Sequence, residues 1–170
     1  MKYLTITLVT LLSVGSFSCD TGLGLLETKI TGKVIFINSA KRPDLVESVW
    51  VVAAAKSLFN NPTLNDLVIS DRPVNLNKDS SEYEVFVPPG SYVIVAAIWK
   101  QKDKDWNFLN IIGRYGYDPV HFTYFDTQPV VISDRQKVVS GKDIICDWSF
   151  VFTGSGNNAR ESLFPSNVNH

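Results

Sequence analysis

The sequence predicts an all-β fold, a β-sandwich of about seven or eight strands, and three observations carry that prediction. The apolar runs beyond residue 27 are rich in Val, Ile, Tyr, Phe and Trp, which favour extended structure. Turn-forming residues separate these runs at short intervals. No apolar pattern of helical period continues for the length of an ordinary helix.

The strands of the first half follow from alternation and from one continuous apolar run. Residues 30–36 alternate from one side of the chain to the other and predict the first strand. Residues 49–55 are almost continuously apolar, which predicts a central strand buried on both faces. A loop with one helical turn near residues 63–67 is expected next, followed by a short edge strand at 74–76. Residues 83–87 alternate again and predict another strand.

In the second half, a Pro88-Pro89-Gly90 turn leads into a strongly apolar strand at residues 91–99. We expect Gly90 to take a positive φ there, because glycine permits a sharp reversal of the chain. A charged hairpin tip at 101–105 and a strand at 108–112 are expected next, followed by an irregular aromatic segment at 117–127. Two closing strands are expected at 129–132 and 138–148.

The first eighteen residues have the layout of a secretory signal peptide: Lys2, an apolar stretch over 3–14, then small residues. Cys19 stands where cleavage would occur, so the segment resembles a bacterial lipoprotein signal. That resemblance implies that Cys19 is acylated and becomes the first residue of the mature chain. Of the three residues before Cys19, only Ser18 fits the strict lipoprotein pattern, so an ordinary signal peptide stays an alternative. A transmembrane anchor is disfavoured, because a bilayer span needs roughly 20 apolar residues.

This interpretation divides the chain into four parts. They are a lipoprotein signal peptide at 1–18, a linker at 19–27, the β-sandwich at 28–151 and a polar tail at 152–170 that we expect to be disordered. The protein is then expected in the bacterial cell envelope, held to a membrane by its N-terminal lipid. Asp20, directly after the cysteine, marks inner-membrane retention in enteric-type sorting. That rule does not hold across all bacteria, so the periplasmic and surface sides both stay open.

Three short motifs resemble transthyretin-like (prealbumin-like) domains, including the carboxypeptidase regulatory-like modules. Residues 84–95, Glu-Val-Phe-Val-Pro-Pro-Gly-Ser-Tyr-Val-Ile-Val, resemble the central hairpin of those domains. Residues 30–36 and 139–145 resemble their first and closing strands. The resemblance implies a transthyretin-like or immunoglobulin-like sandwich. Hydroxyisourate hydrolase, an enzyme of this group, ends in Tyr-Arg-Gly-Ser, whereas this chain ends in Ser-Asn-Val-Asn-His.

Composition and reactive residues argue against several function classes. The net charge is −1 and the basic residues are scattered, so no nucleic-acid partner is expected. Cys146 has no partner if Cys19 carries lipid, and the only histidines are His121 and His170, so neither a metal nor another cofactor is expected. A Cys–His hydrolase built on Cys146 and His121 is disfavoured, because Cys146 falls within a strand pattern where buried, inert thiols are common. Four loop aspartates lack the dense spacing of a Ca²⁺ site and are expected to be solvated: Asp103, Asp105, Asp118 and Asp126.

Aromatic residues gather in one third of the chain and give the only candidate ligand site. The candidate side chains are Trp99, Trp106, Tyr115, Tyr117, His121 and Tyr124, with Phe108, Phe122 and Phe125 nearby. Sandwich domains often bind ligands through loops at one end, and aromatic faces suit sugars or partner side chains. The alternative is that these rings close the end of the sandwich as core. Trp50 and Trp148 are expected to be packing residues.

Three functions therefore stay open. The first is a non-catalytic, lipid-anchored envelope protein that acts as a structural or adaptor module. The second is a carbohydrate- or peptide-binding module that uses the aromatic loop 115–125. The third, least favoured, is an enzyme. Exposed rings in that loop would favour the second function, and buried rings the first.

Overall fold

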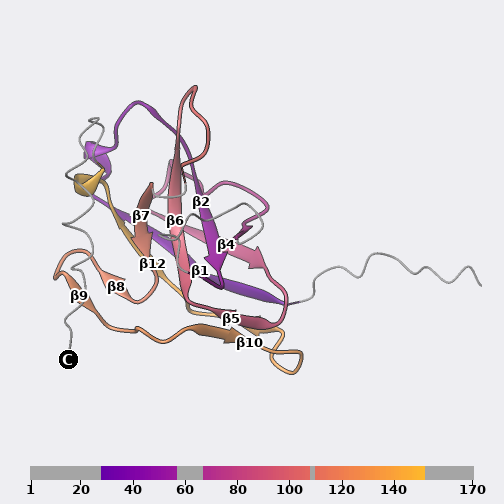
Figure 1. The fold of residues 1–170 in the computed structure, drawn as a ribbon. Helices are drawn as coiled ribbons and strands as arrows, with labels where there is room; N and C mark the ends of the chain where they lie inside the picture. The colour runs from indigo at the N-terminus through magenta and orange to yellow at the C-terminus, as the bar shows by residue number, and fades with distance from the viewer. Residues whose placement is uncertain (1–27, 57–66, 108–109, 152–170) are drawn as a thin grey trace, which may run out of the picture.

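The computed structural model describes residues 28–56, 67–107 and 110–151, and this part of the chain is all-β (Figure 1). It contains twelve strands, and its only helical elements are two short 3-10 turns, Ser39–Lys41 and Trp148–Phe150. The predicted signal peptide with Cys19, the linker, the tail, Phe108 and most of the predicted helical turn lie outside the described residues.

The first sheet is built around β1 (Lys29–Ile37). On one side β1 pairs antiparallel with β4 (Ser80–Phe86). On its other side it pairs in parallel with β11 (Val138–Val139) and then with β12 (Ile144–Asp147). The expected single strand over 138–148 is therefore two strands, separated by a bend at Gly141, whose φ is +72°.

The second sheet has the order β3-β2-β6-β7. Its strands are β3 (Leu67–Ile69), β2 (Val46–Ala54), β6 (Ile94–Gln101) and β7 (Ile111–Arg114). The centre of this sheet is the β2–β6 pair, and residues from Val51 to Ala54 are all buried. The predicted central strand with two buried faces is confirmed. The charged hairpin tip after β6 is also confirmed, since residues 102–105 are exposed.

Two smaller ladders complete the fold. One joins β5 (Gly90–Tyr92) to β10 (Val130–Ile132) along the lower edge in Figure 1. The other is a short hairpin formed by β8 (Tyr117–Asp118) and β9 (Thr123–Tyr124) within the segment expected to be irregular.

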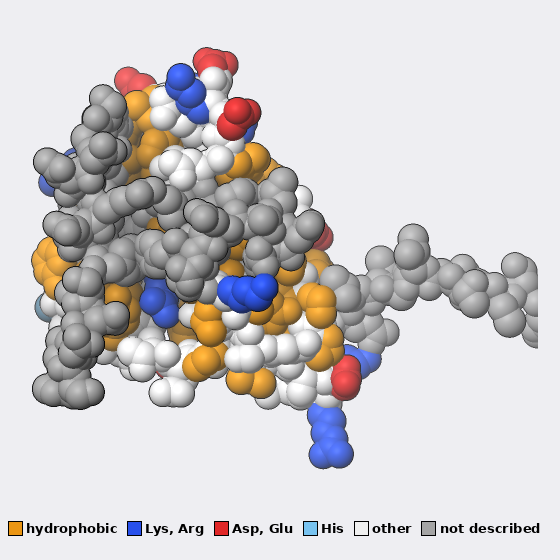
Figure 2. Space-filling model, in the orientation of Figure 1, with side chains coloured by type: hydrophobic (Ala, Val, Ile, Leu, Met, Phe, Trp, Pro, Cys, Tyr) orange, Lys and Arg blue, Asp and Glu red, His pale blue; other side chains and the backbone are white. Residues whose placement is uncertain are grey.

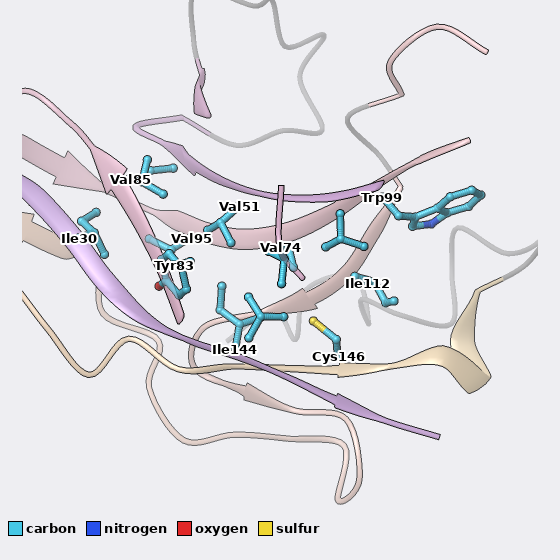
Figure 3. Packing of buried hydrophobic residues seen from close by; sticks show 14 of the residues in the cluster. Ile30, Val51, Val74, Tyr83, Val85, Val95, Trp99, Ile112, Ile144 and Cys146 are labelled. Atoms are coloured by element: carbon cyan, nitrogen blue, oxygen red, sulfur yellow. The ribbon is translucent and has the colours of Figure 1, made fainter. Parts of the chain in front are cut away.

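The core fills the space between the two large sheets (Figure 3). Val51 and Val95 enter it from the second sheet, and Ile30 and Ile144 enter it from the first. Trp148 is buried and stacks on Phe36 with ring centroids 5.5 Å apart, as expected of a packing residue. Trp50 is partly buried and packs against a second apolar cluster on the other face of the β2–β6 pair.

One glycine lets the two sheets approach each other closely. A Cβ atom built on Gly113 in β7 would overlap the Ile145 carbonyl oxygen and lie 2.7 Å from the Cys146 Sγ atom in β12. No side chain fits at Gly113 without moving backbone atoms of the facing strand.

Two strand assignments are corrected by the pairing of the chain. The strand before β4 is at Leu67–Ile69 rather than at 74–76, where the Val74 N–H instead donates to the Val49 carbonyl from a loop. The apolar run 91–99 is two strands, because the chain changes partners at the exposed Val93. Tyr92 pairs with Val130 of β10, whereas Ile94 already pairs with β2.

The expectation of a positive φ at Gly90 is wrong, since the described glycines with positive φ are Gly116 and Gly141. The reversal before β5 needs no left-handed residue. Tyr92 instead closes this hairpin, because its buried ring carries a hydroxyl that donates to the Pro88 carbonyl at 2.7 Å.

Candidate functional site

The β8–β9 hairpin is built on a turn that the Asp118 side chain organises. The Asp118 carboxylate accepts a hydrogen bond from the Val120 backbone N–H at 2.8 Å and lies 2.7 Å from the His121 Nδ1 atom. Such a short polar side chain bonded two residues ahead is a common way to fix a turn. Tyr117 and Tyr124, which pair across the hairpin, have ring centroids 4.9 Å apart.

Four large apolar side chains on this hairpin are exposed to solvent. The exposed fractions are 62% for Phe122, 60% for Phe125, 54% for Val120 and 40% for Tyr124. Hydrophobic side chains lie at the left margin of Figure 2, over the position of β8 and β9 in Figure 1. We call these four residues the aromatic surface. The Phe125 ring also packs edge-on against Tyr115 at 5.9 Å, so its exposed part lies beside the base of the hairpin. Exposed apolar side chains that occur together on one short segment commonly mark a binding site.

Phe122 has an unfavourable backbone conformation in addition to its exposure. Its φ is +53°, in the left-handed region, which bulky L-residues rarely adopt. The Phe122 ring contacts Phe150 edge-on at 5.5 Å. A left-handed φ costs roughly 1–2 kcal/mol for a residue with a side chain, and an exposed ring recovers little of it by burial. Strain of this kind concentrates at functional sites.

The base of the hairpin is held rigidly by a hydrogen-bonded network. The Tyr115 hydroxyl donates to the Asp126 carboxylate at 2.6 Å and accepts from the Lys142 ammonium at 2.8 Å. The same ammonium lies 4.3 Å from the centre of the Tyr115 ring. Gly116, with φ +85°, lies so close to the Asp126 carbonyl that a Cβ there would overlap it. The network therefore fixes both ends of the hairpin to the body of the domain.

Two carboxylates of the hairpin are stabilised in the ionised form. The hydrogen bond with His121, aided by the Val120 N–H, holds the pKa of Asp118 below its ordinary value. The Tyr115 hydroxyl and the Gln128 N–H do the same for the pKa of Asp126. Both groups are thus negative at neutral pH and serve as hydrogen-bond acceptors that shape the loop.

The structure separates the residues that the sequence grouped as candidates. His121 and Tyr124 lie on the exposed hairpin, and the half-buried Tyr117 packs against Tyr124 across it. Tyr115 is half-buried in the basal network, where its hydroxyl is already engaged.

The two tryptophans of the candidate set lie elsewhere. Trp99 is 5% exposed and belongs to the main core, so it cannot present its ring to a ligand at this surface. Trp106 contacts Trp50 edge-on at 6.1 Å and packs against the second apolar cluster. The most exposed rings, Phe122 and Phe125, were seen in the sequence only as neighbours of the set. Apolar content alone could not show that they point outward.

Other reactive residues show no catalytic arrangement in the described part of the chain. Cys146 is completely buried, and burial raises the pKa of its thiol, whereas His121 is exposed and bonded to Asp118. Among the described residues no group of three or more His, Cys, Asp or Glu side chains could hold a metal ion. No helix within the described ranges is long and apolar enough to cross a membrane.

Comparison with protein-family models, with curated proteins and with solved structures finds no match to this chain.

Proposed function

We propose that this protein is a non-catalytic, lipid-anchored binding module of the bacterial cell envelope, which docks an apolar segment of a partner protein on its aromatic surface. The observation that carries the proposal is the exposure of Phe122 and Phe125 on a hairpin whose base is fixed. Rings this exposed add little to the stability of the domain itself, so contact with a partner is the role that best accounts for them.

The chemistry of the surface favours a peptide over a carbohydrate. Phe122, Phe125 and Val120 carry no hydrogen-bonding groups, whereas a sugar needs partners for its hydroxyls. Apolar and aromatic partner side chains are desolvated favourably against such rings. Carbohydrate is the second candidate, on the basis of Tyr124 alone, whose ring is exposed and lies 5.8 Å from the Arg114 guanidinium carbon.

The position of the hairpin suits a partner on the side away from the anchor. The N-terminal end of β1 and the β8–β9 hairpin lie on opposite sides of the domain in Figure 1. If Cys19 is acylated, residues 20–28 connect the lipid to β1 and span at most about 30 Å. The aromatic surface then lies on the side of the domain away from the point where this segment joins it.

The proposed fold type is the transthyretin-like sandwich. It is supported by the Tyr92 hydroxyl that closes the 88–92 turn. It is also supported by the position of β1, which pairs antiparallel with β4 on one side and in parallel with β12 on the other. These features agree with the three resembling motifs, and they would also suit an immunoglobulin-like sandwich.

The docking proposal is tested with a photo-crosslinking amino acid placed at Phe122 or at Val131 in the full chain, in cells that express it. Val131 is the matched control, because its side chain is 60% exposed on a different ladder, β10. We expect a discrete adduct from position 122 that is absent from position 131 and lost when Phe125 is replaced by Ser. Identical adducts from both positions, or none from either, would exclude the aromatic surface as the docking site.

The anchor is tested separately by the mass of the mature N-terminus. Cys19→Ala should abolish acylation and release the protein from membranes, because only the thiol accepts the diacylglyceryl group. An unmodified terminus or an uncleaved Met1 in the wild type would contradict the anchor without bearing on the aromatic surface.

A further inference from the structure

The strand β4 has an open edge. β4 pairs with β1 alone, and no other strand of the described part of the chain lies along its second edge. Its seven residues make an edge of roughly 20 Å at the usual rise of a β-strand. Unpaired edges of this length are sites where another chain can add a strand.

The register identifies which peptide groups face outward. The Val87 N–H donates to the Thr28 carbonyl, and the Phe36 N–H donates to the Asp79 carbonyl. Both bonds join odd-numbered residues at the two ends of β4 to β1. In an antiparallel pair, successive residues of a strand direct their N–H and C=O groups alternately toward the partner strand and away from it. The peptide groups of Ser80, Glu82, Glu84 and Phe86 therefore point to the open edge.

A groove of about 530 Å³ lies between β4 and the loop that precedes it, and charged side chains line both walls. Glu82 and Glu84 of β4, with Lys33 of β1 beside Glu82, line the strand wall, and Arg72 and Lys78 line the loop wall. Glu84 forms an ion pair with Lys29 at 2.7 Å, and Glu82 has no ion-pair partner in the described part of the chain. Successive side chains of an extended strand point to opposite sides, so a strand in this groove would present alternate residues to the two walls.

The charges of β4 disfavour a second copy of this chain as the occupant. An antiparallel pair centred on Glu82, on Tyr83 or on Glu84 places a glutamate directly opposite a glutamate of the other copy. Like charges directly opposite each other destabilise a pair of strands. In these three registers the edge therefore disfavours its own copy, whereas a strand of complementary charge meets no such repulsion.

We propose that β4 binds an extended segment of another protein by strand addition, and that the segment alternates basic with acidic side chains. The basic side chains meet Glu82 and Glu84, and the acidic ones meet Arg72 and Lys78. The backbone hydrogen bonds go to the outward peptide groups of Glu82 and Glu84. This site is separate from the aromatic surface and does not depend on it.

The test uses a synthetic heptapeptide of alternating Lys and Glu, blocked at both ends, and a peptide of the same composition with its charges in two blocks. Amide hydrogen exchange of the full chain is followed by NMR. We expect binding of the alternating peptide at about millimolar Kd or tighter. Exchange of the Glu82 and Glu84 amides should slow on binding, while the Ser81 and Tyr83 amides should be protected with and without peptide.

Proline variants test which backbone N–H groups of β4 point to the open edge. Glu82→Pro removes an outward N–H and should keep the fold, because edge strands tolerate proline where the N–H faces solvent. It should weaken peptide binding by about tenfold relative to Glu82→Thr, which has no carboxylate either but keeps the N–H. Ser81→Pro removes an N–H directed at β1 and should lower the melting temperature.

Three results would overturn the proposal. One is protection of the Glu82 and Glu84 amides in the free chain, and a second is equal binding of the alternating and block peptides. The third is protection that rises with protein concentration, which would make a second copy the occupant.

Discussion

Replacing Gly113 by Ala should strongly destabilise the protein. The added Cβ would overlap the Ile145 carbonyl oxygen and lie 2.7 Å from the Cys146 Sγ atom. Ile145 is paired with Ile35 in the parallel β1–β12 ladder, so its carbonyl cannot move without disturbing that ladder. Overpacking costs about 1–3 kcal/mol where side chains can adjust, and a backbone obstacle places Gly113→Ala at the upper end, about 3 kcal/mol.

Two other glycines provide matched controls, measured by chemical denaturation. A Cβ at Gly90 would lie 3.8 Å from the Tyr92 ring, and its φ is not positive, so Gly90→Ala should be neutral or stabilise by up to about 1 kcal/mol. A Cβ at Gly141 would meet nothing within 4 Å, but φ is +72° there. Gly141→Ala should therefore cost about 1–2 kcal/mol from backbone strain alone. If Gly113→Ala unfolds at the same denaturant concentration as Gly90→Ala, β7 and β12 do not approach as described.

Four further predictions follow from the hydrogen bonds and burial. Tyr92→Phe should cost about 1 kcal/mol, the net value of its bond to Pro88, and Tyr92→Ala about 3 kcal/mol or more, both measured by urea denaturation. Phe122→Gly should be more stable than Phe122→Ala, the reverse of the order at ordinary positions, because φ is +53°; equal stabilities would contradict the strain. The folded state lowers the pKa of Asp126, so this group stabilises the fold above the ordinary carboxyl pKa and loses that effect as the pH falls through its lowered value. Asp126→Asn should therefore flatten the acid side of the stability profile, and an unchanged profile would contradict this role. The Cys146 thiol should react with a thiol reagent only after unfolding, and reaction in the native state at the rate of a free thiol would contradict its complete burial.

Alternation and β-branched composition were enough to predict the strands that pair over most of their length. β1, β2 and β4 lie close to their predicted positions, because the side-chain period of a strand is recorded directly in the sequence. The charged tip after β6 was also predictable, because consecutive charged residues need contact with solvent.

The points at which long apolar runs divide into two strands were not predictable, because they depend on which other strands each part pairs with. Val93 divides the run 91–99 because Tyr92 pairs with β10 and Ile94 pairs with β2. Both halves are apolar, so their sequence carries no sign of the exchange. The strand at Leu67–Ile69 was missed because three residues are too few to display a period.

The candidate site was predictable as a region but not as a surface. Aromatic content drew attention to residues 99–125, but it does not show that Trp99 is buried and Phe122 exposed. Trp99 belongs to the buried strand β6 and its side chain lies in the core. Phe122 belongs to the turn that Asp118 organises and its side chain is exposed to solvent. Side-chain burial depends on contacts between distant segments, and one sequence does not record them.

The sequence by itself determined that the described chain is extended and which strands form its centre, because local steric preference and side-chain period act on neighbouring residues. Only the tertiary structure decided which glycines have no room for a side chain and which aromatic rings reach the surface. Gly90 looked essential from its turn, yet it has room for a side chain, whereas Gly113 has none because β12 lies against it. The space around an atom belongs to segments that meet only after folding, and for that reason the tertiary structure was needed to find it.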